Sequence, residues 1–185
     1  MPLAASDQVI ADTRRWLERA VIGLNLCPFA KAVHVRQQVH FAVCGSPDFA
    51  EILQALDDEL DALLGLPASV RDTTLLMLPG GFDEFLLFQQ LIAEGDRRIA
   101  RRGLEGTVQL AHFHPEFRFA HVEEDDPGNY SNRSPYPTLH LLREDSIDRA
   151  VAAMPDAEAI FGANIERLRS LGPAGWAALH VGRST

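Results

Sequence analysis

Apolar residues recur every three or four positions in five stretches of the chain, a spacing typical of amphipathic helices. In the first stretch, from Val9 to Leu24, arginine and glutamate side chains occupy the opposite face. Ser6 or Asp7 is the expected N-cap of this helix, and the proline after Cys27 favours a helix end near that residue. The other four stretches predict helices over residues 49–64, 83–102, 145–154 and 157–171.

Four shorter stretches have the pattern of β-strands. Residues 38–44 alternate between apolar and polar positions, whereas residues 73–78 form an apolar run typical of a strand buried on both faces. Residues 107–114 and 138–142 predict two further strands. Because strands alternate with helices of crossover length, we expect an α/β or α+β fold with one small mixed sheet of about four strands covered by helices. The first three strands should be partly parallel.

The totals place the chain in a broad class. With 185 residues, 46% of them apolar and 23% charged, residues 1–185 are expected to form a single globular domain. The net charge of −9 argues against nucleic-acid binding, and no apolar run reaches the roughly 18 residues of a membrane span. Two cysteines and the lack of a charged-then-apolar leader indicate a reducing cytoplasm. The sequence specifies neither a cofactor nor an oligomeric state.

A long loop at about residues 115–137 is the most informative segment. Residues 129–134 are six consecutive side chains that can form hydrogen bonds, and prolines at 127, 135 and 137 bracket them. Proline restricts the backbone, so the loop should have a defined shape. Loops longer than about 12–15 residues are usually functional or disordered, and the apolar residues here disfavour disorder. We interpret the loop as part of a functional site; a structural Ω-loop that caps the domain is the alternative.

Arg133 and Arg143 are the candidate ligands for a small anion. A guanidinium presents its donors in a planar fork and stays charged at any relevant pH, which suits a carboxylate or phosphate. Internal ion pairs are the alternative, with the acidic run 123–126 for Arg133 and with the next two acidic residues for Arg143. Further candidate ligand-binding residues are Lys31, Asn129, Tyr130, Asn132, Ser134 and Tyr136.

Cys27, His114 and His140 are the candidate catalytic residues. The Cys27 thiol could act as a nucleophile or redox group if a spatial partner activates it, because a helix C-terminus does not. A small buried apolar residue is the alternative for this cysteine. His114 follows a predicted strand at its carboxyl end, where ligands gather in α/β sheets, and it could serve as a general acid or base.

A metal site is a separate hypothesis. His112 and His114 are two positions apart and therefore project on the same face of their strand. They could offer two imidazoles to a metal, and His140 could be a third ligand. Because zinc sites require three or four ligands, Cys27 or an acidic side chain from residues 116–126 could complete the set. Ordinary hydrogen-bonded histidines are the alternative.

Three segments of the sequence resemble those of a bacterial protein family catalogued only as a domain of unknown function. They read Leu-Asn-Leu-Cys-Pro-Phe-Ala-Lys at 24–31, Gln-Leu-Ala-His-Phe-His-Pro at 109–115, and Asn-Tyr-Ser-Asn-Arg-Ser-Pro-Tyr-Pro-Thr-Leu-His-Leu-Leu-Arg-Glu at 129–144. The resemblance covers nearly the whole chain and implies no activity. His112 departs from the family pattern, in which a small residue is expected. The residues that match motif positions are Cys27, Pro28, His114, Asn129, Asn132, Arg133, Ser134, Tyr136, His140 and Arg143.

Three functions are consistent with these residues. The first is a cytoplasmic enzyme that acts on a small anionic metabolite through a Cys/His/Arg site. The second is a metal-binding protein that uses His114 and His140. The third is a non-catalytic protein that docks a partner through the 129–136 loop. The first hypothesis requires Cys27, His114, Arg133 and His140 to converge on one cavity.

Overall fold

In the computed structural model, which describes residues 3–120, 122–153 and 159–184, four strands form one mixed sheet. The strands are β1 (Val39–Val43), β2 (Thr73–Met77), β3 (Val108–Phe113) and β4 (Thr138–Arg143). Their order in the sheet is β1-β2-β4-β3. β1 and β2 pair in parallel, whereas β4 runs antiparallel to both of its neighbours. The expected mixed sheet of four strands is therefore confirmed, and the first three strands share one direction.

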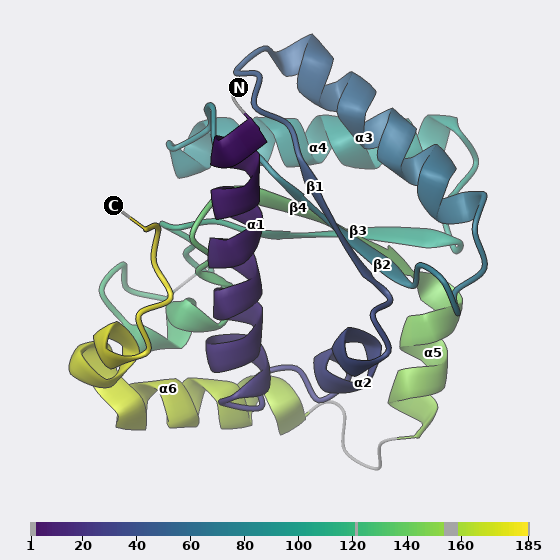
Figure 1. The fold of residues 1–185 in the computed structure, drawn as a ribbon. Helices are drawn as coiled ribbons and strands as arrows, with labels where there is room; N and C mark the ends of the chain where they lie inside the picture. The colour runs from purple at the N-terminus through teal and green to yellow at the C-terminus, as the bar shows by residue number, and fades with distance from the viewer. Residues whose placement is uncertain (1–2, 121, 154–158, 185) are drawn as a thin grey trace.

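Helices cover both faces of this sheet (Figure 1). α3 (Phe49–Leu64) and α4 (Phe85–Arg101) pack against Leu76, Leu139 and Leu141 on the face that we call the α3/α4 face. α1 (Leu3–Trp16) packs against Leu75 and Met77 on the opposite face, which we call the α1 face. The remaining helices are the π-helix η1 (Leu17–Ile22), α2 (Ala30–Val35), the 3₁₀-helix η2 (Pro127–Asn132), α5 (Glu144–Ala152) and α6 (Ala159–Ala178).

The sequence accounts well for α3. The Asp48 carboxylate accepts hydrogen bonds from the backbone N–H groups of Ala50 at 2.9 Å and Glu51 at 3.0 Å, and so caps the helix. The apolar side chains on its inward face are buried. All five residues of β2 are buried as well, as the uninterrupted apolar run predicts for a central strand.

Several predicted element ends are wrong. α1 already begins at Leu3, so neither Ser6 nor Asp7 is its N-cap, and the helix continues beyond Trp16 with the wider π geometry of η1. The short helix α2 is not predicted by the sequence, and none of its residues is buried. α5 starts at Glu144 directly after β4, one residue before the predicted start at 145, and no side chain caps it.

α6 also differs from the expected last helix. The predicted start at residue 157 lies outside the described residues, and the helix runs to Ala178. Gly172 adopts a φ of 67° and Pro173 follows it, which places a kink inside the helix. Phe161 of α6 is 54% exposed. It lies against Phe119 of the long loop, with ring centroids 5.3 Å apart.

Two leucines of α4 test its placement. Leu91 is fully buried, whereas Leu86 is 70% exposed. Leu91→Ala should lower the free energy of unfolding by about 2–5 kcal/mol because it leaves a cavity, and Leu86→Ala should change it by less than about 0.5 kcal/mol. Urea unfolding followed by circular dichroism measures both values. Similar losses for the two variants would contradict this orientation of α4.

Candidate functional site

Cys27 lies on the α1 face, between η1 and α2. Its side chain packs against the buried cluster around Trp16, which also includes Phe113 of β3. Burial raises the pKa of the Cys27 thiol, although the backbone N–H groups of Phe29 and Ala30 act in the opposite direction. The thiol is therefore protonated at neutral pH, and a neighbouring base is needed to make it a nucleophile. π-helices such as η1 are rare in proteins, and those that occur are often located at functional sites.

His140 lies on the same face of the sheet, in the central strand β4. It is paired with Leu75 of β2, which packs under α1, and its ring lies 5.5 Å from that of Phe113, between centroids. His140 Nε2 is 2.7 Å from the hydroxyl of Thr73, and this hydroxyl donates its proton to the Leu141 carbonyl at 2.6 Å. A hydroxyl has one proton, so Thr73 must accept from His140, and this fixes the Nε2–H tautomer.

The other nitrogen of His140 is consequently a hydrogen-bond acceptor. Nδ1 is covered from solvent, although the residue as a whole is only partly buried, and it has no partner among the described residues. Burial lowers the pKa of His140 to about 4, so the ring is neutral at physiological pH and keeps its Nδ1 lone pair. The hydrogen bond at Nε2 thus orients the His140 ring, and the lone pair on Nδ1 has no partner among the described residues.

Trp16 supplies a complementary group on the α1 face. Its Nε1 is buried and has no hydrogen-bond partner within the described part of the chain. Trp16 packs edge-to-face on Phe113, with centroids 4.9 Å apart, and the other contact of Phe113 is with His140. Buried polar atoms are nearly always paired in native proteins. Here an N–H donor and a nitrogen acceptor, both unpaired among the described residues, belong to two rings that contact the same phenylalanine.

His114 belongs to the opposite side of the sheet. Its ring lies against Phe85 and Phe88 of α4, with centroids 5.2 and 5.1 Å away. Nε2–H donates to the Phe82 carbonyl at 2.8 Å, and Nδ1 accepts from the backbone N–H of Glu116 at 3.0 Å. Burial lowers the pKa of His114 and outweighs the hydrogen bond to Phe82, which acts to raise it, so the ring is neutral. Both ring nitrogens therefore have hydrogen-bond partners. The bond to the Phe82 carbonyl holds a residue whose backbone has an unusual φ of 63°.

The three candidate metal ligands are not brought together. His112 contacts Phe88 of α4 and lies with His114 on the α3/α4 face, as their spacing predicts. His140 projects from the α1 face, so the sheet separates it from the other two histidines. Within residues 3–120, 122–153 and 159–184, no group of three or more His, Cys, Asp or Glu residues is placed to hold a metal ion.

Arg133 is engaged inside the long loop. Its Nε donates to the Phe117 carbonyl at 3.2 Å, and its Nη2 donates to the Glu124 carbonyl at 2.7 Å. The guanidinium also lies over the ring of Tyr130, 5.0 Å from the centroid. The acceptors are backbone carbonyls rather than the acidic side chains considered from the sequence. Arg133 therefore ties the two ends of the loop together.

Arg143 has a similar role at the end of α3. Its Nη2 donates to the carbonyls of Leu63 and, at 2.6 Å, of Leu66, and its Nε donates to the Arg71 carbonyl at 3.2 Å. The last carbonyls of a helix have no partner within the helix. Arg143 satisfies them and so joins β4 to α3.

The other loop residues also form internal contacts. Asn129 is fully buried: its Oδ1 accepts from the Phe119 N–H at 3.0 Å and its Nδ2 donates to the Glu123 carbonyl at 2.7 Å. Ser134 donates to the Tyr136 carbonyl at 2.6 Å. The ring of Tyr130 packs on Trp176, and Asn132 Nδ2 donates to the His112 carbonyl at 3.5 Å. Lys31 is exposed on α2.

Asp12 is a buried charged residue that the sequence does not single out. It is fully buried on α1 and accepts hydrogen bonds from the Tyr136 hydroxyl at 2.9 Å and from the Ser184 hydroxyl at 2.6 Å. Burial alone would raise the pKa of Asp12, but hydrogen bonds from Ser184, Tyr136 and Gln8 outweigh it and lower this pKa to about 2. Burial and the Asp12 bond together raise the pKa of Tyr136 to about 12. The available sequence signal was an aspartate at a position where the apolar spacing of the first helix predicts burial.

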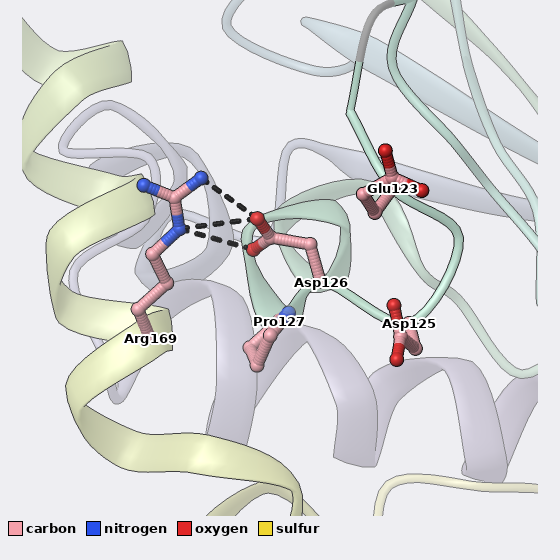
Figure 2. Close-up of a pocket in the computed structure, with 5 residues that line it drawn as sticks. All are labelled: Glu123, Asp125, Asp126, Pro127 and Arg169. Atoms are coloured by element: carbon pink, nitrogen blue, oxygen red, sulfur yellow. Dashed lines mark hydrogen bonds and ion pairs between the residues drawn. The ribbon is translucent and has the colours of Figure 1, made fainter.

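The hollow shown in Figure 2 is lined by an ion pair. It has a volume of about 450 Å³ and lies between the long loop and α6. Arg169 reaches from α6 to Asp126, with a shortest N–O distance of 2.7 Å (Figure 2). This pair, and a second bond from the Gly128 N–H, lower the pKa of Asp126. The nearby Glu123 and Asp125 are exposed, and the Asp126–Arg169 pair joins the long loop to α6.

The fold defines a small α/β protein with a single mixed sheet and an internally hydrogen-bonded loop before its last strand. The chain belongs to the family described as protein of unknown function DUF1415, whose family model matches residues 8–178. This confirms the family resemblance of the three sequence segments. No curated protein and no solved structure matches the chain. Among the described residues, no helix is both long enough and apolar enough to cross a membrane.

The Asp12 contacts lead to a prediction about stability. Asp12→Asn should lower the free energy of unfolding at neutral pH by about 1–3 kcal/mol, because the amide loses charge-assisted hydrogen bonds. The folded pKa of about 2 lies below the ordinary 3.8. The carboxylate therefore contributes fully above its ordinary pKa, and this contribution is lost as the pH falls through about 2.

Urea unfolding at several pH values measures this effect. The difference between wild type and Asp12→Asn should shrink as the pH falls below about 4. Asp7→Asn is the matched control, because Asp7 is exposed on the same helix. Equal losses for the two variants would show that the buried contacts of Asp12 do not stabilise the fold.

Proposed function

We propose that this protein is an enzyme that binds a small polar molecule on the α1 face and uses His140 as its general base. The observation that supports the proposal is the pair of unpaired buried nitrogens, His140 Nδ1 and Trp16 Nε1, in two rings that both contact Phe113. A molecule with an acceptor for the Trp16 N–H and a separate donor for His140 Nδ1 would satisfy both. The low pKa of His140 keeps its base form populated at neutral pH.

The support for His140 has the arrangement expected of a catalytic base. The Thr73 hydroxyl accepts a hydrogen bond from the Nε2–H of His140 and donates one to the Leu141 carbonyl. The ring is therefore held in one orientation and one tautomer. A base that is oriented by a third group in this way recurs in enzymes that activate a nucleophile or abstract a proton. A bound molecule would donate its O–H or N–H to Nδ1 and transfer that proton in the reaction.

Cys27 is the second reactive group that the proposal places near the bound molecule. It packs in the same apolar cluster as Trp16 and Phe113. The proposal does not include selectivity for anions, because Arg133 and Arg143 both donate to backbone carbonyls. It also does not use the 129–136 loop as a docking element, because most of that loop is buried.

The state of the His140 ring tests this proposal directly. In ¹⁵N-labelled protein, long-range ¹H–¹⁵N spectra should show a neutral ring with the proton on Nε2 and a pKa of about 4. His140→Phe assigns the signals. Thr73→Val removes the acceptor and should raise the fraction of the Nδ1–H tautomer. A ring that titrates near the ordinary value of about 6.5, or that carries its proton on Nδ1 in the wild type, would exclude the general base.

A binding measurement tests the α1 face separately. Small alcohols, amides and hydroxy acids that raise the melting temperature of the wild type should lose this effect in His140→Phe. His40→Phe is the matched control, because His40 is 46% exposed and projects from the opposite face. Compounds that stabilise His140→Phe as strongly as the wild type would count against binding at this face.

A further inference from the structure

A second hollow adjoins the first, with which it shares Glu123, and lies beside the start of α4. Its volume is about 430 Å³, within the range of about 300–1,000 Å³ that is usual for ligand pockets. One wall consists of Phe85, Leu86 and Gln89 of α4, and the other includes Phe119 and Val122 of the long loop. We call it the α4 pocket.

Apolar surface continues around this pocket. Leu86 lines it and is 70% exposed, although a leucine on an amphipathic helix would normally face the core. Phe161 of α6 is 54% exposed and packs edge-to-face on Phe119, which lines the pocket. Exposed apolar patches of this kind often mark a surface that binds another molecule.

The charged residues of the pocket are mostly acidic. Glu123 and Glu124 line it, and two exposed acidic residues directly precede α4: Glu84, and Asp83, which pairs with Arg183 at 2.9 Å. The one cation among the lining residues, Arg118, pairs with Glu124 at 3.1 Å. The whole chain carries a net charge of −9. An apolar pocket with an acidic rim is complementary to an apolar side chain next to positive charges.

We infer that the α4 pocket binds a short segment of a partner protein that places one large aliphatic or aromatic residue beside lysine or arginine. The apolar residue enters between Leu86 and Phe119, and the cations lie against Glu123 and Glu124. A second copy of this chain fits less well, because two copies carry the same net charge of −9 and repel each other. This surface is separate from the α1 face, so it goes beyond the proposed enzymatic function.

Selection from a random peptide library displayed on phage tests the inference with the full chain as bait. The selected peptides should share an aliphatic or aromatic residue flanked by lysine or arginine. In fluorescence anisotropy, Leu86→Ser should weaken binding of a labelled selected peptide by roughly tenfold or more, as expected for a central apolar anchor. The double variant Glu123→Gln and Glu124→Gln should weaken it and reduce its salt dependence.

Val70→Ser is the matched control, because Val70 is 57% exposed before β2, away from the pocket. It should leave peptide binding unchanged, and both Val70→Ser and Leu86→Ser should keep the wild-type melting temperature. The inference is overturned if no peptide is enriched, if the enriched peptides are acidic or uncharged, or if Leu86→Ser binds them as well as the wild type. A mass that rises with concentration in the wild type and stays monomeric in Leu86→Ser would assign the pocket to self-association instead.

Discussion

The antiparallel insertion of β4 between β2 and β3 is the constraint on which the rest of the structure depends. β4 is the last strand in the chain, yet it contributes hydrogen bonds to two neighbours and closes the centre of the sheet. Both of its faces are used: Leu139 and Leu141 complete the core under α3 and α4, while His140 projects toward α1. Its last residue, Arg143, donates to the Leu63 carbonyl in the last turn of α3 and to the Leu66 carbonyl just after it.

This insertion explains the unusual sequence of the preceding loop. The chain between β3 and β4 is long and partly buried, and buried backbone groups outside regular structure need hydrogen-bond partners. Asn129 provides two of them and Arg133 provides two more. A dense run of polar side chains between prolines is therefore what a buried, irregular loop requires. A ligand site would require similar side chains, and only their contacts distinguish the two cases.

The regular elements could be predicted because their signals are local. The apolar spacing of α3, the apolar run of β2 and the shared face of His112 and His114 all depend on residues close in sequence. The face on which His140 lies depends instead on the register between β4 and β2, and a shift of one residue would reverse it. The partners of Asp12 are likewise distant in sequence, at Tyr136 and Ser184. Local patterns contain no information about such pairings.

The contacts of His114 connect the sheet with the α4 pocket. Through Nε2–H it holds the Phe82 carbonyl, just before α4, and through Nδ1 it holds the N–H of Glu116, at the start of the loop that forms the opposite wall. The ring must be neutral to accept at Nδ1, and its burial lowers the pKa in the direction that keeps it neutral. His114 thus joins the backbone just before α4 to the start of the long loop.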